Sequence, residues 1–321
     1  MQPVTIRDTH SGSQASIAVH LGFNCYDFRA VVGDTVVDVL DASPEFSSGS
    51  ERPSGHGTPI LFPFPNRIRD GRMTWEGREY HLPESSVPYD NTGNAIHGFC
   101  LDRPWRVANQ TENSLTGEFQ LSVDAPDRLE FWPADFLLQF TYRVKGAALI
   151  AEVNITNPDH KPLPWGFGTH AYFKLPLSPD SQPENCLIEV PVSKQWELID
   201  CLPTGEISTI PANKNLQEGL RFGEVQLDDV FTGLPVDSQV HETLIYDEAA
   251  GLQLSQRFGS EYREVVVFTP PGRNAVCIEP YTCVTDAINL QKAGIETGWR
   301  VLPPGGTFNT QIVLEAGPII V

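Results

Sequence analysis

Residues 141–155 read TYRVKGAALIAEVNI, and this stretch decides the expected fold class. Apolar and polar residues alternate on both sides of Lys145-Gly146, as they do in two antiparallel strands joined by a tight turn. Hairpins of this kind pair neighbouring strands without a crossover helix, so they favour antiparallel sheets. Two further stretches have the same design: MTWEGREYHL at 73–82, turning at Glu76-Gly77, and LIYDEAAGLQLSQRF at 244–258, turning around Ala249–Gly251.

Glycine and proline punctuate the whole chain and do not collect in one linker. The 321 residues include 26 Gly and 27 Pro, which implies many short elements joined by turns. The alternation of strands with long helices that marks a doubly wound fold is missing. We therefore expect an all-β fold, a large antiparallel β-sandwich of two packed sheets that forms a single domain over residues 1–321. The expected strands are Ser16–Phe23, Thr35–Leu40, Leu115–Val123, Phe136–Lys145, Ala147–Thr156, Leu187–Val192, Glu242–Tyr246, Leu252–Phe258, Glu264–Thr269, Ala275–Glu279 and Gln311–Glu315.

Two long loops rich in Ser, Gly and Pro interrupt this pattern, Asp41–Pro59 and Glu84–Asn94. We expect both loops to lie at the surface or to roof a cleft, because buried irregular backbone would leave polar groups unpaired. No internal repeat or low-complexity segment accompanies them.

Composition and charge argue against several classes of protein. Hydrophobic residues make up 40% of the chain, which is enough for a folded core. Lys and Arg number 22 against 41 Asp and Glu, and the formal charge of −19 repels nucleic-acid phosphates and anionic lipid. We therefore expect no nucleic-acid partner and no membrane association. The first ten residues lack a hydrophobic leader region and the six cysteines are scattered without a CxxC pair, so we expect reduced thiols and a cytoplasmic location.

Common sequence motifs for metal and nucleotide binding are also missing. None of the eight histidines stands in an HxH or HExxH pattern, and no GxGxxG, GxxxxGK[ST] or GxSxG stretch occurs. We expect neither a metal nor a cofactor. Acid–base chemistry by side chains alone is what remains.

His170 has the most unusual surroundings of any histidine, within LPWGFGTHAYFKLP at 163–176. Aromatic residues at 165, 167, 172 and 173 flank it, and aromatic walls around one titratable group suit a sugar ring. An imidazole in a partly apolar wall works as an acid or base near neutral pH. The glycines indicate backbone that passes close to another group. The alternative is a core histidine bonded to the backbone.

Two more candidates precede it in the chain. His97 stands in NAIHGF at 94–99, where a simple turn histidine is the alternative. Arg67 stands in LFPFPNRIRDGRMTW at 61–75, together with Asn66 and Arg69. An arginine among apolar and Pro residues needs an acceptor, which is either a structural carboxylate or a ligand oxygen.

Acidic candidates follow near the C-terminus. Glu279, in AVCIEPYTCVTDAINL at 275–290, ends an apolar strand immediately before Pro280. Burial there would raise its carboxyl pKa and make it a base near neutral pH, whereas the alternative is an edge glutamate paired with an arginine. Asp228 and Asp229, in VQLDDVFTGL at 225–234, form an acidic pair of a kind that is usually solvated in so acidic a chain.

Five of these segments together resemble the aldose 1-epimerase (galactose mutarotase) family, from about Pro59 to the C-terminus. Each segment is a weak signal alone, but their order along the chain is the order found in that family. The resemblance implies a galactose mutarotase-like supersandwich, a large antiparallel β-sandwich with the sugar in an open cleft. The segments are NRIRDGRMTWEGREYHLP, NAIHGF, GFGTHAYF, LDDVF and IEPYTCVTDAINL.

The resemblance also implies an activity, the interconversion of α and β anomers of an aldohexose by acid–base ring opening, without metal or cofactor. His170 matches the family's general acid, which protonates the ring oxygen, and Glu279 matches the general base, which takes the anomeric hydroxyl proton. Arg67, His97 and Asp228 match substrate-binding residues, with Asp229 one register away and still possible. The acid and the base are expected to flank the pyranose from opposite sides.

Departures from the best-known branch of the family leave the substrate open. Ala171 follows His170 where Pro is frequent, and Pro280-Tyr281-Thr282-Cys283 follows Glu279 in place of an aromatic-rich tail. A hexose 6-phosphate or another acidic hexose is therefore an alternative substrate, with Arg67 and Arg69 available to an anionic group. A glycoside hydrolase using two carboxylates and a non-catalytic carbohydrate-binding β-sandwich are further alternatives. Nothing in the sequence indicates an oligomeric state.

Overall fold

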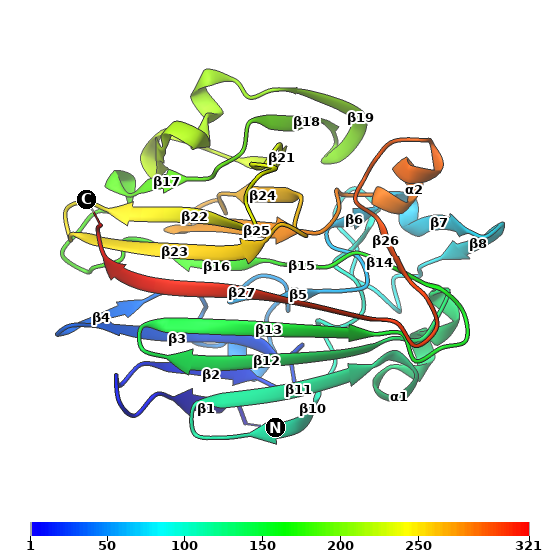
Figure 1. Cartoon of the computed structure of the whole chain (residues 1–321), viewed down its shortest axis with the longest axis horizontal. Coiled ribbons are helices and arrows are strands. Elements are labelled where there is room, and N and C mark those ends of the chain that lie inside the picture. Colours follow the sequence, from blue (N-terminus) through cyan, green and yellow to red (C-terminus); the bar gives the residue numbers. More distant parts are fainter. Residues whose placement is uncertain (1, 321) are drawn as a thin grey trace.

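The computed structural model describes residues 2–320 and confirms the all-β prediction. Its largest sheet is antiparallel and has nine strands, whose long members run horizontally across Figure 1. In spatial order these strands are β10 (Arg106–Gln110), β11 (Ser114–Gln120), β12 (Leu137–Lys145), β13 (Ala148–Thr156), β27 (Thr307–Pro318), β23 (Leu252–Gly259), β22 (Val240–Asp247), β17 (Leu187–Glu189) and β20 (Leu220–Arg221).

The second sheet has eight strands and carries the candidate site. Its last strand, β16, lies off the main path and pairs with β25. In spatial order the strands are β19 (Leu202–Thr209), β18 (Lys194–Ile199), β21 (Asp228–Thr232), β24 (Glu264–Phe268), β25 (Ala275–Tyr281), β15 (Gly168–Thr169) and β5 (Ile60–Leu61), with β16 (Ala171–Lys174) beside β25.

Smaller elements complete the fold. Among residues 2–320, neither α-helix is long and apolar enough to cross a membrane. A four-stranded sheet contains β1 (Val4–Arg7), β2 (Gln14–Ala18), β3 (Asn24–Val32) and β4 (Thr35–Asp38). The two-stranded pairs are β14 (Leu163–Trp165) with β26 (Arg300–Leu302), β6 (Arg67–Ile68) with β9 (Ala95–Ile96), and β7 (Arg72–Trp75) with β8 (Arg78–His81). The α-helices are α1 (Leu121–Asp124) and α2 (Ala287–Lys292), and 3-10 turns lie at Phe46–Ser48, Arg69–Gly71, Pro126–Phe131, Pro183–Asn185, Ala212–Lys214, Leu216–Glu218 and Phe222–Glu224.

All three hairpins expected from the sequence form. In β7–β8, Trp75 pairs with Arg78, and Glu76 and Gly77 between them both have positive φ, as a type I′ turn requires. In β12–β13, Lys145 pairs with Ala148, so the connection is two residues long and begins at Gly146. The β22–β23 hairpin closes through Asp247 opposite Leu252.

The two large sheets pack face to face and enclose the main core. Phe140 and Leu149 from the nine-stranded sheet share an internal gap with Ala171 from the other sheet. Across this layer the side-chain amide of Gln256 on β23 donates to the backbone carbonyl of Ile278 on β25, at 3.3 Å. This is the packed sandwich that the strand pattern predicted.

Several predicted strand ends are wrong. The expected strand Leu115–Val123 stops at Gln120, and the chain turns into α1 at Leu121. The expected strand Ser16–Phe23 stops at Ala18, and Phe23 has a positive φ of 54°, which no strand allows. These segments are apolar because they are buried in turns, which a period-two pattern does not distinguish from strands.

Strand β25 has two faces with different roles. Val276 and Ile278 point into the main core between the sheets, whereas Tyr281 belongs to a second apolar cluster on the other face. Because side chains alternate along a strand, Glu279 lies on the same face as Tyr281. The strand also continues past Glu279 to Tyr281, so the expected end before Pro280 is wrong.

Candidate active site

One open cavity of about 560 Å³ is lined by all five residues singled out in the sequence, His170, Glu279, Arg67, His97 and Asp228. They come from the residue between β15 and β16, from β25, from β6, from the segment after β9, and from β21. Their positions along the chain span more than two hundred residues, so the two-sheet topology is what brings them together.

His170 and Glu279 are neighbours across two paired strands. Gly168 pairs with Tyr281 and Ala171 pairs with Ile278, so the same register places His170 opposite Glu279. His170 Nε2 lies 3.3 Å from Glu279 Oε1. The two groups therefore stand side by side on one sheet face, and the expectation that they flank a sugar from opposite sides is wrong.

Burial controls the protonation of this pair. Glu279 is 1% exposed, and desolvation raises its carboxyl pKa well above the usual value. Desolvation also lowers the pKa of His170 to about 3, with further lowering from arginines around the cavity. The direction for Glu279 agrees with the sequence-based expectation, whereas a His170 pKa of about 3 does not agree with the expectation of an imidazole that works near neutral pH; burial is the main cause. Both shifts favour the uncharged form of each group.

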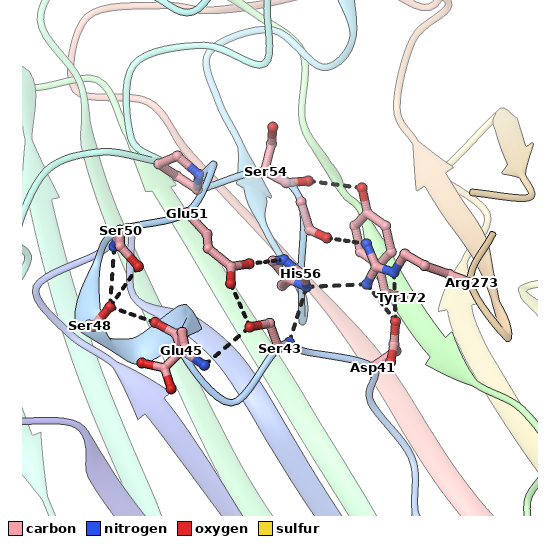
Figure 2. Close-up of polar contacts among 12 residues, drawn as sticks. Asp41, Ser43, Glu45, Ser48, Ser50, Glu51, Ser54, His56, Tyr172 and Arg273 are labelled. Carbon is pink, nitrogen blue, oxygen red and sulfur yellow. Dashed lines mark hydrogen bonds and ion pairs between the residues drawn. The ribbon is translucent and has the colours of Figure 1, made fainter. Parts of the chain in front are cut away.

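Tyr172 holds the His170 ring in place from one side. The two rings are stacked with centroids 4.7 Å apart and an interplanar angle of 8°. The Tyr172 hydroxyl donates to the carbonyl of Ser54 at 3.0 Å, and the guanidinium of Arg273 lies 4.7 Å from the Tyr172 ring centre (Figure 2). The imidazole is thus oriented by packing, while its Nδ1 atom is buried without a hydrogen-bond partner among residues 2–320.

The loop expected over residues 41–59 forms part of the cavity wall. Arg52, Ser54 and Gly55 line the cavity, which confirms the prediction that this loop roofs a cleft. Figure 2 shows how the loop is fastened: Arg273 donates to the carbonyl of Gly55 at 2.7 Å and, through Nε, to Asp41 at 2.9 Å. Arg273 therefore connects the loop over residues 41–59 with Tyr172, the residue that stacks on His170.

His97 and Arg67 form the next part of the wall. The His97 ring meets the His170 ring edge-on, with centroids 5.5 Å apart, and burial lowers the pKa of His97 well below its usual value. Arg67 Nε donates to Asp90 at 2.6 Å, and its Nη1 donates to the side chain of Asn66 at 2.9 Å. The second expected loop, Glu84–Asn94, thus supplies the carboxylate that orients Arg67.

The acidic pair on β21 divides between two environments. Asp228 lines the cavity at its exposed mouth, whereas Asp229 pairs with Lys214 Nζ at 2.7 Å. Of the two alternatives left open by the sequence, Asp228 is the one that faces the cavity. The thiol of Cys201 donates to Asp228 at 3.7 Å.

Other expectations about the cavity are corrected. Trp165, Phe167 and Phe173 belong to the main core, so Tyr172 alone remains of the expected aromatic wall at 165–173. Arg69 is not among the lining residues and lies 3.7 Å from Asp286. The sequence did not single out the roof residues or Val266 and Phe268 of β24, which line the cavity because they share its sheet face.

A thiol also approaches the acid–base pair. Donor atoms of His170, Cys277 and Glu279 lie within 4.8 Å of one another. Burial raises the pKa of the Cys277 thiol well above its usual value. A metal-free site stays our prediction.

Solved structures share this architecture. A galactose mutarotase-like protein from Clostridium acetobutylicum superposes with a TM-score of 0.86 and 22% identity over 96% of this chain and 94% of that one. The aldose epimerase homologue of C. elegans superposes with a TM-score of 0.80 and 18% identity over 99% of both chains. The fold is therefore the galactose mutarotase-like sandwich.

The family model for aldose 1-epimerase matches residues 5–315, and the chain belongs to this family. Escherichia coli K12 YihR is 23% identical over 241 residues, which cover 74% of each chain. The galactose mutarotase of Rattus norvegicus is 33% identical over 110 residues, which cover 34% of this chain and 30% of that one. Family and fold together support a mutarotase-type carbohydrate epimerase, an isomerase that acts on a small-molecule sugar.

Proposed function

We propose that this chain is an aldose 1-epimerase that interconverts the α and β anomers of an aldohexose, with His170 as general acid and Glu279 as general base. The observation that carries the proposal is the 3.3 Å approach of His170 Nε2 and Glu279 Oε1 in the cavity. The ring oxygen and the anomeric hydroxyl oxygen of a sugar are bonded to the same carbon. An acid and a base that serve both oxygens must therefore stand side by side, as these two groups do.

The His170–Glu279 pair holds one proton before and after ring opening, and two proton transfers connect these two states. Ring opening delivers a proton from His170 to the ring oxygen while Glu279 takes the anomeric hydroxyl proton, and the C1–O5 bond breaks. The open-chain aldehyde turns about C1–C2, and reclosure on the other face reverses both transfers. Burial favours the proton on Glu279 in the empty cavity, so the acid–base assignment requires its prior transfer to His170. This transfer leaves the net charge of the pair unchanged.

The remaining polar residues are proposed to hold the sugar. Arg67 is fixed by Asp90, so its guanidinium is oriented before substrate binds. Asp228 at the cavity mouth offers a hydroxyl acceptor, and the His97 side chain, which also lines the cavity, offers a further polar contact. Orientation of reacting groups contributes several kcal/mol to a rate, so we expect variants of these residues to weaken binding and turnover together.

The test is anomer exchange measured by polarimetry and by NMR exchange spectroscopy on freshly dissolved aldoses. We expect His170→Asn and Glu279→Gln each to abolish catalysed exchange while circular dichroism and thermal unfolding show an intact fold. His160→Asn, which changes an exposed histidine, is the matched control and should retain the wild-type rate. Near-wild-type exchange in either site variant would refute the assignment.

A second candidate is an aldose with an anionic substituent, such as a hexose 6-phosphate. The observation that favours it is Arg52, an exposed arginine that lines the cavity. A panel of neutral, phosphorylated and sulfonated aldoses separates the two candidates. Arg52→Gln should raise KM only for the charged sugars if the anion binds there. Release of free sugar from an aryl glycoside would instead favour a hydrolase, and binding without exchange would favour a lectin.

A cytoplasmic location is part of the same proposal. All six cysteines are free thiols, and five of them are buried. Fractionation of the native host with an antibody against the chain tests it, and recovery of the protein from an oxidising compartment would contradict it.

A further inference from the structure

Tyr281 is a polar residue of the cavity region to which the proposed mechanism gives no role. It follows Glu279 by two residues on β25, so both side chains lie on the same sheet face. Tyr281 is completely buried, and its hydroxyl donates to Glu279 Oε2. The other carboxyl oxygen, Oε1, is the one that faces His170.

The strand beside Tyr281 is shaped to admit its ring. Gly168 pairs directly with Tyr281, and a Cβ atom at position 168 would lie 2.3 Å from Tyr281 Cδ1. The glycine of the GFGTH segment, which the sequence suggested must pass close to another group, therefore passes close to this phenol. Because Gly168 has no side chain, the ring of Tyr281 fits beside it, and the phenol hydroxyl reaches Glu279.

We propose that Tyr281 is a positioning residue that occupies Glu279 Oε2 and so directs the carboxyl proton to Oε1, the oxygen that faces His170. The inference rests on the proposed function of the pair. Burial raises the pKa of Tyr281 well above its usual value, so the phenol keeps its proton and remains a donor through the range in which enzymes are assayed. With Oε2 already accepting a hydrogen bond, a proton bound by Glu279 resides on the oxygen that touches the imidazole.

The donated hydrogen bond also favours the ionised carboxylate and so opposes burial. The charged or titratable groups around Glu279 are His170 beside β16, Tyr172 on β16, Cys277 and Tyr281 on β25, Asp228 on β21 and Arg67 on β6. Cys277 and Tyr172 have raised pKa values, so both stay neutral near pH 7. Neither group therefore changes the ionisation of Glu279 by titrating in this range. Loss of the phenol should therefore raise the pH at which the carboxyl ionises.

The experiment measures the pH profile of anomer exchange for Tyr281→Phe. We expect the descending limb of kcat, which reports loss of the proton that the pair must hold, to move to higher pH by about one to two units, since a hydrogen bond to a charged group is lost. We expect kcat at neutral pH to fall about ten- to a hundredfold while KM changes by less than about threefold. Tyr262→Phe, another fully buried tyrosine whose hydroxyl contacts Thr310, is the matched control and should leave the profile unchanged.

A second variant keeps the test valid if Tyr281→Phe does not fold. Tyr281→3-fluorotyrosine retains the ring and the hydroxyl but is a stronger donor, so the descending limb should move to lower pH. An unchanged profile in a folded variant of either kind would overturn the proposal. If the wild type exchanges no aldose, the proposed function fails, and a ¹³C NMR titration of the Glu279 carboxyl, assigned with Glu279→Gln, still tests the hydrogen bond by itself.

Discussion

Glu264 gives the sharpest prediction about stability, because it is a buried carboxyl outside the cavity. It begins β24, is 0% exposed and receives a hydrogen bond from Trp196 Nε1 at 3.0 Å through Oε2. Its Oε1 atom has no partner among residues 2–320. Desolvation raises the carboxyl pKa of Glu264 from 4.5 to about 7. The folded state therefore binds a proton that the unfolded chain releases.

The sign and size of the effect follow from this difference. A carboxyl with a raised folded-state pKa contributes stability that is fully present below about pH 4.5 and is lost as pH rises through about 7. The difference of about 2.5 pH units, at about 1.4 kcal/mol per unit, corresponds to about 3 kcal/mol of unfolding free energy. That is a large share of the 5–15 kcal/mol typical of a folded domain.

The perturbation is Glu264→Gln, which keeps the shape and the acceptor for Trp196 but cannot ionise. Guanidinium unfolding at several values between pH 4.5 and pH 8.5 should show the variant gaining about 3 kcal/mol relative to wild type across this range. Any packing cost of the amide adds a constant offset that does not depend on pH. Glu197→Gln, an exposed glutamate beside Trp196 on β18, is the control. Parallel wild-type and Glu264→Gln curves over the whole range would refute the reasoning.

Two further predictions concern the support of the site. Gly168→Ala should lower the free energy of unfolding by about 1–3 kcal/mol, because the new methyl group overlaps the ring of Tyr281; an unfolding midpoint equal to wild type in a denaturant titration would contradict this. Asp90→Asn should free the guanidinium of Arg67 and so raise KM and lower kcat, each several-fold; steady-state exchange kinetics with both constants unaltered would show that Arg67 needs no anchor.

The turns and the fold class could be predicted because their causes are local. Glu76-Gly77 and Gly146 carry the residue types that tight hairpin turns require, although the second turn lies one residue later than predicted, and alternation on each side fixes the strands. The end of β11 could not be predicted, since Leu121 is apolar in a helical turn for the same reason that it would be apolar in a strand, namely burial. An apolar residue pattern indicates that a segment is buried, but it does not indicate whether the segment is a strand or a helical turn.

The residues of the cavity could also be predicted only in part. Local context and family resemblance singled out His170 and Glu279, but their contact depends on a pairing between segments about a hundred residues apart. Pro280 suggested that the strand ended at Glu279, because proline cannot donate to a sheet. The strand continues to Tyr281 because Pro280 lies where the pairing of β25 with β15 and β16 is interrupted, between Gly168 and Ala171. Because the strand was predicted to end at Glu279, Tyr281 was not among the candidate residues.

The same alternation that stabilises β25 also fixes the chemistry of the site. Val276 and Ile278 fill the core between the sheets, and Glu279 lines the cavity. A shift of the register by one residue would carry Ile278 to the cavity and bury Glu279 in the apolar layer, at a cost far above that of any local distortion. The hydrophobic core thus selects the register that aligns Glu279 with His170. For this reason a core substitution on β25 that loosens the register should impair exchange before it unfolds the protein.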